Sequence, residues 1–399
     1  MKRGFITILS LCLAVVFTAG CCGNSARVGA TLPAWSEGYL DIHTISTGRG
    51  ECIFMVLPDG TSIVVDAGEF SREGGKYTNV IQRPNAETRP TKAFGDYIRH
   101  FNPHQAIDYF NLSHFHMDHM GNAEPEYERS AEGDYLLTGV MALHHQVPYL
   151  EVIDRAYGAY DSLAVKAMSV KVLPEYQKFL EHHTANGTIK ASRFELGAVN
   201  QFALKHNAEA YPNFSIENIC SNGYVWSNGQ AVDVYEGIRD AIRENAASCG
   251  FVIRYGAFDF LTAGDIGDYH DLELRVAEAV GQVEAVKSHH HLSPHSMCQP
   301  SVEVLRPQVI VATSFYNRDI QPDKSKFNYI AEVGCALYCT SVGEEELAAD
   351  PAAYESCAAV SGHNVIRVAP GGAEYMVYTL DDTDSNYRVT KIDGPFICR

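Results

Sequence analysis

One short segment, HFHMDH at positions 114–119, places three imidazoles and one carboxylate within six residues. The residues before it, IDYFNLS at 107–113, have the composition of a buried strand, so the segment begins where a strand ends. In extended backbone, side chains two positions apart point the same way, so the first two histidines can approach one cation together, and a turn can direct the rest to a neighbouring cation. Imidazole nitrogen and carboxylate oxygen suit zinc, manganese or iron. The predicted metal ligands here are His114, His116, Asp118 and His119.

Two later segments offer further ligands, each at the end of a strand-like run. In FLTAGD at 260–265, an apolar run presents Asp265, whose two carboxylate oxygens can each take one cation. Gly-Asp after a strand is more often a turn or a helix cap, but this one lies between two histidine clusters. The second segment is KSHHHLSPH at 287–295. We expect one of its histidines to complete a second metal site and favour His290, followed by His291, with the choice among residues 289–291 left open.

Strand-like and helix-like segments alternate along the chain, which predicts a layered α/β (α+β) fold. We expect a signal peptide at 1–21, a linker at 22–38 and one domain over 39–399. Within that domain, residues of about 136–205 have mostly helical periodicity and are interpreted as an insertion, and residues of about 305–399 are rich in β signals.

The first 21 residues have two cations, an apolar run and then small residues, which is the layout of a secretory signal. Their ending, TAGC, resembles a bacterial lipoprotein cleavage box, with Cys21 as the lipidated residue. We therefore expect an exported protein, either a periplasmic or cell-surface lipoprotein anchored through Cys21 or, after ordinary cleavage, a secreted one. Export permits disulfides among the late cysteines, and sequence does not give their pairing. These cysteines are Cys335, Cys339, Cys357 and Cys398.

The formal net charge of −18 disfavours attraction to nucleic acid or to anionic membrane surfaces. It leaves room for a local positive site built around metal ions. We therefore expect a small-molecule or cell-envelope-derived substrate rather than long nucleic acid.

Four blocks of the chain together resemble the metallo-β-lactamase superfamily, and within it the ComEC-like branch, which includes the hydrolase domain of DNA-uptake channel proteins. The blocks are LDIHTISTGRGECIFMVLPDGTSIVVDAG at 40–68, SHFHMDHMGN at 113–122, CGFVIRYGAFDFLTAGD at 249–265 and EAVKSHHHLS at 284–293. The branch usually has Pro-His-His-Gly-Ser in the last block, where this chain has His289 and Leu292 in place of proline and glycine. In the first block Gly-Gln-Gly-Asp is usual, and this chain has Gly-Arg-Gly-Glu at 48–51.

The resemblance implies an αββα sandwich with a dinuclear metal site at one edge of its two sheets. Carried over by position, the first two histidines of segment 114–119 bind metal one, and its aspartate and last histidine bind metal two. Asp265 bridges the two cations, His290 completes the second site, and Asp66 supports the ligand loop. The superfamily often has another histidine on metal one, although each candidate here is more often a buried histidine with satisfied hydrogen bonds. The candidates are His144, His145, His182, His183 and His206.

The resemblance also implies a metal-dependent hydrolase. Two divalent cations, with zinc expected and manganese or iron as alternatives, lower the pKa of a shared water so that hydroxide forms near neutral pH. Asp118 is the predicted catalytic residue, because it orients the nucleophile and helps to move its proton. Esters, amides and phosphodiesters fit this chemistry, and we favour a phosphodiester because the branch includes nuclease and phosphorylcholine esterase relatives. The alternative is a non-catalytic surface binding lipoprotein that retains a structural metal site.

Overall fold

The computed structural model describes residues 26–69, 80–124, 126–160, 171–315 and 321–399. The predicted signal peptide at 1–21, with the candidate lipidation site Cys21, lies outside the described residues. Within the described ranges, no helix combines the length and the apolar character that a membrane crossing requires.

Among the described residues, nine strands form the first sheet, here called sheet one. Neighbouring strands are antiparallel from β18 to β3, and β3 to β6 are parallel. Their order across the sheet is β18 (Val389–Ile397), β17 (Glu374–Leu380), β16 (His363–Val368), β1 (Leu40–Thr44), β2 (Ile53–Val56), β3 (Ser62–Val65), β4 (Ile107–Leu112), β5 (Tyr149–Asp154) and β6 (Lys190–Arg193).

The second sheet, sheet two, also has nine strands. Its strands are parallel from β15 to β11 and antiparallel from β11 to β9. Both hairpins from β7 to β9 close through Asn-Gly pairs with positive φ at each residue, as the tight hairpin turns require. The order is β15 (Cys357–Ala359), β14 (Ala336–Cys339), β13 (Val309–Ala312), β12 (Ala285–Lys287), β11 (Phe258–Thr262), β10 (Gly250–Tyr255), β7 (Phe214–Ser221), β8 (Tyr224–Ser227) and β9 (Gln230–Asp233).

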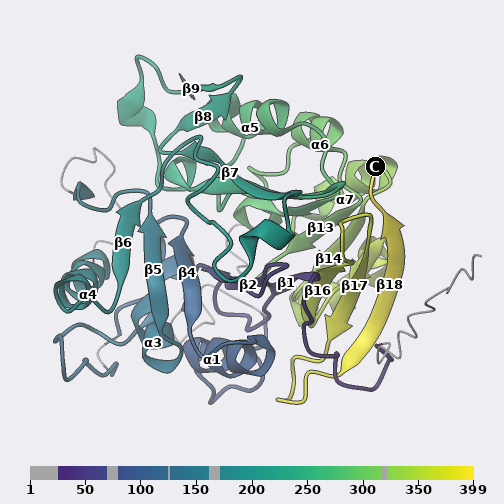
Figure 1. The fold of residues 1–399 in the computed structure, drawn as a ribbon. Helices are drawn as coiled ribbons and strands as arrows, with labels where there is room; N and C mark the ends of the chain where they lie inside the picture. Colours follow the sequence, from purple (N-terminus) through teal and green to yellow (C-terminus); the bar gives the residue numbers. More distant parts are fainter. Residues whose placement is uncertain (1–25, 70–79, 125, 161–170, 316–320) are drawn as a thin grey trace, which may run out of the picture.

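Three apolar clusters hold these sheets and their helices together. One lies between the sheets and includes Ile42 of β1 and Phe251 of β10. The other two pack the outer face of each sheet against helices, which lie on opposite sides of the molecule (Figure 1). The helices are α1 (Pro90–Phe101), α3 (Gly139–Gln146) and α4 (Leu173–Ala185) on sheet one, and α5 (Leu272–Val280), α6 (Gln299–Leu305) and α7 (Phe327–Glu332) on sheet two. The four layers confirm the predicted αββα sandwich.

The segments that the sequence singled out have definite places in these layers. Residues 136–205 contribute α3 and α4, and they also contribute β5 and β6, which extend sheet one beyond β4. The part from about 305 to 399 supplies β13–β15 to sheet two and β16–β18 to sheet one. Of the expected linker, residues 26–38 run against sheet one: Leu32 is buried, and the Gly29 N–H donates to the Val389 carbonyl at 2.8 Å.

A buried ion pair fixes the register between β1 and β16. Asp41 and Arg367 are direct cross-strand partners, and the guanidinium donates from Nε and Nη2 to the two carboxylate oxygens at 2.8 and 2.6 Å. Burial works against ionisation of Asp41, but the Arg367 charge and hydrogen bonds from His43 and Arg367 outweigh it and lower the pKa to about 2. Because the folded pKa lies below the usual 3.8, the pair stabilises the fold above about pH 4 and less as the pH falls toward 2.

Replacing Arg367 with methionine should leave the Asp41 carboxylate buried without its partner. We expect a loss of about 3–5 kcal/mol in the free energy of unfolding at pH 7, measured by urea denaturation. The gap between the variant and the parent should narrow as the pH falls from 7 toward 2, because the unpaired Asp41 of the variant becomes protonated at a higher pH than the paired Asp41 of the parent, whose pKa is about 2. An equal gap at pH 7 and pH 3 would contradict this account.

Candidate metal centre

The chain brings the ends of several parallel strands from both sheets to one place. In sheet one, β3 ends just before Asp66 and β4 ends just before the 113–119 loop. In sheet two, Asp265 follows β11, the 289–291 histidines follow β12, and Thr313 follows β13. Carboxyl ends of parallel strands share one edge of a sheet, so loops far apart in sequence meet over the sandwich.

Nitrogen donors converge on the Asp265 carboxylate. Its Oδ2 lies 3.0 Å from His119 Nε2, 3.1 Å from His291 Nε2 and 3.9 Å from His114 Nε2. Around these groups, His114 Nε2 faces His116 Nδ1 at 3.1 Å, and Asp118 Oδ2 lies 3.4 Å from His291 Nε2. Asp118 and His119 reach this point because they occupy α2 (Met117–Met120), a single helical turn directly after the extended pair. The loop therefore has the shape that its spacing predicted.

Three of the imidazoles are held from behind through Nδ1. His119 Nδ1 donates to Asp66 Oδ2 at 2.7 Å, and Asp66 also accepts from the backbone N–H and hydroxyl of Ser113. Ser113 Oγ lies 3.0 Å from His114 Nδ1, and Thr313 Oγ1 lies 3.0 Å from His291 Nδ1. When a ring is neutral with its proton on Nδ1, its Nε2 faces Asp265 with a lone pair available to a cation. This arrangement is how proteins orient histidines that bind metal.

Glu51 and Lys287 form a buried ion pair beside these donors. Lys287 Nζ lies 2.7 Å from Glu51 Oε2 and 3.7 Å from Asp265 Oδ1. Burial opposes both charges, yet their attraction lowers the pKa of Glu51 to about 2 and raises that of Lys287. Glu51 Oε2 accepts from Thr313 Oγ1 and lies 3.2 Å from His291 Nδ1, on the ring edge away from Asp265. We therefore interpret Glu51 as a residue that orients His291.

The sequence did not single out this pair. Glu51 appeared only where the resembling branch has aspartate, and Lys287 only as the first residue of the KSHHHLSPH segment. A carboxylate two residues before β2 and a lysine at the end of a buried strand were the available signals.

Two glycines allow main chains to touch beneath the ligand loop. A Cβ built on Gly68 would lie 1.7 Å from the Asp118 carbonyl oxygen, and one on Gly50 would lie 2.4 Å from Gly68. Backbone hydrogen bonds close the same contact, because the Glu51 N–H donates to the Asp118 carbonyl and the Gly68 N–H donates to the Glu51 carbonyl. Only glycine permits this approach. The glycines in GRGE and VVDAG thus bring three loops into direct backbone contact.

A second buried ion pair supports the first half of the loop. Arg155, 1% exposed, donates from Nε and Nη2 to the carboxylate of Glu244. Glu244 Oε1 also accepts from the Phe115 N–H at 2.8 Å, and the guanidinium lies over the Phe115 ring at 4.3 Å. Phe115 stands between His114 and His116, so this pair fixes the backbone that carries both. Nothing in the sequence linked residues 155 and 244.

The centre fits a cation. One donor atom from each of Glu51, His119, Asp265 and His291 lies within 4.8 Å of the others, and all four residues are buried. Burial disfavours a charged imidazole, but the Asp265 carboxylate outweighs it, raising the pKa of His119 and bringing that of His291 to about 10. Among the described residues, buried Asp265 Oδ1 has no hydrogen-bond partner. The buried carboxylates therefore require compensating positive charge. Imidazole nitrogen and carboxylate oxygen are also the donors of divalent metal sites.

The 289–291 histidines point in different directions. His290 and His291 both have positive φ, 42° and 55°, so the backbone turns sharply between successive side chains. His289 Nδ1 pairs with Glu273 at 2.8 Å. His290 lies beside Asn245 and Ser293, with its Nε2 3.2 Å from Asn245 Nδ2. The structure thus places His291, rather than the favoured His290, against Asp265.

The middle-region histidines have other neighbours. His144 accepts from the Tyr149 N–H, and His183 bonds Tyr135 and Thr188. The three others lie toward the surface: His145 is exposed, His182 is 3.9 Å from Glu132, and His206 is 3.6 Å from Asp108. No contact joins any of these five to the Asp265 cluster in the part of the chain that the structure describes.

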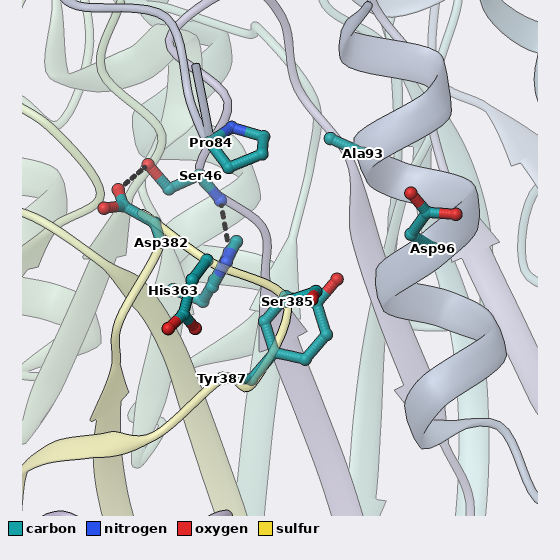
Figure 2. A pocket seen from close by; sticks show the side chains of 9 residues that line it. Ser46, Pro84, Ala93, Asp96, His363, Asp382, Ser385 and Tyr387 are labelled. Carbon is teal, nitrogen blue, oxygen red and sulfur yellow. Dashed lines mark hydrogen bonds between the residues drawn. The ribbon is translucent and has the colours of Figure 1, made fainter. Parts of the chain in front are cut away.

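A separate group of serine, histidine and aspartate lines a small pocket beside α1 (Figure 2). Ser46 Oγ donates to Asp382 Oδ2 at 2.7 Å, whereas the Ser46 backbone N–H donates to His363 Nδ1 at 3.0 Å. Burial lowers the pKa of His363 to about 3. A nucleophilic triad needs the histidine to accept the serine hydroxyl proton, and here the carboxylate accepts it. This group is a structural hydrogen-bond cluster.

Comparisons with known proteins find only distant structural similarity. No protein-family model matches the chain, and no curated protein matches it. Among solved structures, the short form of human tRNase Z matches at 11% identity over 68% of this chain and 90% of its own, with a TM-score of 0.32. The hydrolase AbOPH of the beta lactamase superfamily matches at 9% identity over 78% and 90%, with a TM-score of 0.31.

Replacing Glu51 with glutamine should weaken zinc binding by about 10- to 100-fold, the usual effect of removing a group that orients a metal ligand. The change removes the nearer of the two carboxylates beside Lys287 and loosens His291. Competition with a chromogenic chelator measures the affinity.

Glu303→Gln, an exposed site on α6, serves as the matched control and should bind as the parent does. Thr313→Val keeps the ion pair and removes only the hydroxyl beside His291. Its zinc affinity should therefore lie between those of Glu51→Gln and Glu303→Gln. Full zinc affinity in a folded Glu51→Gln protein would overturn the role assigned to Glu51.

Proposed function

We propose that the protein is an exported metal-dependent hydrolase that acts on a small phosphodiester or another ester, with two divalent cations as cofactors. The observation that carries the proposal is the convergence of three oriented imidazole Nε2 atoms on the Asp265 carboxylate, within a buried cluster of imidazole and carboxylate groups. A purely structural role for this cluster would not require each ring to turn its Nε2 toward the same carboxylate.

The donors divide into two groups. His114 Nε2 and His116 Nδ1 face each other at 3.1 Å and would hold one cation. Asp118, His119 and His291 would hold the other, and Asp265 lies between the groups. Cations at such a site lower the pKa of a water and polarise the oxygen of the bond to be cleaved. Zinc suits this set of nitrogen and carboxylate donors, and manganese or iron also fits.

Asp118 has the position expected of the group that handles protons. Its side chain is 16% exposed, whereas those of Asp265, His119 and His291 are at most 1% exposed. It therefore borders the open side of the donor cluster, where a substrate and its attacking water would arrive. A carboxylate at that point can orient the water and accept its proton as the new bond forms.

Charge argues for a small substrate. A chain with a formal net charge of −18 repels long polyanions, while a compact phosphodiester or an ester from the cell envelope avoids most of that repulsion. The N-terminal signal supports export, with lipidation at Cys21 as the proposed membrane link.

Metal content and turnover together test the proposal. Mature protein purified without chelator should contain about two equivalents of zinc, manganese or iron by elemental mass spectrometry. Asp265→Asn should lower both that content and the hydrolysis of bis(p-nitrophenyl) phosphate, the latter by at least about 100-fold, because a bridging ligand matters more than its supports.

Asp134→Asn, an exposed position, provides the matched control and should leave both measurements unchanged. Including p-nitrophenyl acetate and nitrocefin in the assay separates phosphodiesterase, esterase and β-lactamase activity. Two bound cations without turnover of any ester would favour the non-catalytic binding lipoprotein, and unchanged turnover in Asp265→Asn would overturn the two-cation proposal.

A further inference from the structure

Two thiols lie on neighbouring strands at the edge of sheet two. Cys339 ends β14 and Cys357 begins β15, the parallel edge strand beside it. Cys357 is the direct partner of Leu337, and side chains two apart on a strand share a face, so Cys339 and Cys357 point to the same side. All three belong to the apolar cluster beneath α7. A register shift after Leu337 accompanies this pairing.

The two cysteines are neighbours on adjacent strands, and their side chains interact. The Cys339 thiol donates a hydrogen bond to Cys357, which raises the pKa of Cys339 and lowers that of Cys357. Cys335, which precedes β14, directs its thiol to the Ala336 carbonyl at 3.7 Å. Of the four late cysteines whose pairing the sequence left open, the structure brings these two together.

We propose that Cys339 and Cys357 form a redox-active pair that closes into a disulfide by exchange with a disulfide-bearing partner. The inference is independent of the hydrolase function. Cys357 is only partly buried and Cys339 is fully buried, so an incoming disulfide meets Cys357 first.

The exchange balances without any other oxidant. The Cys357 thiolate attacks one sulfur of the partner's disulfide, that S–S bond breaks, and one partner thiolate leaves. Cys339 then gives its proton to solvent and attacks the Cys357 sulfur of the mixed disulfide, and the second partner thiolate leaves. Two thiols of this chain are oxidised to one disulfide. The partner's disulfide takes the two electrons and, with two protons, becomes two thiols.

The segment between the two cysteines explains what the bond would do. The segment contains α8 (Glu344–Ala349), none of whose residues is buried. Tyr354, near its end, is buried and packs against Phe327. At its end, β15 is a three-residue edge strand. A disulfide between the two ends of this segment reduces the conformational freedom of the unfolded chain and holds the edge strand β15 against β14.

The test begins with the full chain in glutathione buffers of graded oxidised-to-reduced ratio. After thiols are blocked with iodoacetamide, peptide mapping by mass spectrometry should find one cross-linked pair that contains Cys339 and Cys357. The oxidised protein should melt on the order of 5 °C above the reduced one.

Cys335→Ser is the matched control, since it removes a thiol on the same strand segment and should leave the cross-link and the melting shift intact. Cys357→Ser should abolish both. Peptide mapping of the parent protein tests the proposed disulfide even if a variant folds poorly. A cross-link between other cysteines, or free Cys339 and Cys357 at every glutathione ratio, would overturn the proposal.

Discussion

The Asp265 carboxylate is the constraint on which the site depends, because both sheets deliver their loops to it. A buried carboxylate needs compensating charge or hydrogen bonds. Here imidazoles from β4 and β12 loops and the ammonium of Lys287 surround it at 3.0–3.9 Å. The packing of the two sheets against each other therefore sets the distances within the donor cluster. A change in how the sheets stack would separate donors that the chain keeps more than a hundred residues apart in sequence.

Several layers of support surround the donors, and each acts at a different point. Asp66 and Ser113 hold His119 and His114 from sheet one, while Thr313 and Glu51 hold His291 from the other side. Arg155 and Glu244 fix the main chain at Phe115 rather than any ring. These hydrogen bonds preorganise the donor side chains before a cation binds. They do not involve the ring nitrogens that face the inside of the donor cluster.

The layered fold and the local shape of the 114–119 loop followed from sequence, because period-two spacing and a strand end are local properties. The same holds for Asp265, which follows a strand, whereas the supporting role of Asp66 came from the resemblance to the metallo-β-lactamase superfamily. The choice between His290 and His291 did not follow, since it depends on two consecutive residues with positive φ, which sequence patterns for non-glycine residues rarely indicate. Glu51, Lys287 and the Arg155–Glu244 pair escaped notice because their partners are brought together only by the stacking of the sheets.

The contact among Gly50, Gly68 and Asp118 has a consequence for how this scaffold tolerates change. The ligand loop rests on main chain, with no space for even a methyl group between the segments. Side chains at the rim can therefore vary in size and charge without shifting the donors. The residues around such a site can therefore change to fit new substrates. A mutation at either glycine would instead displace the ligand loop.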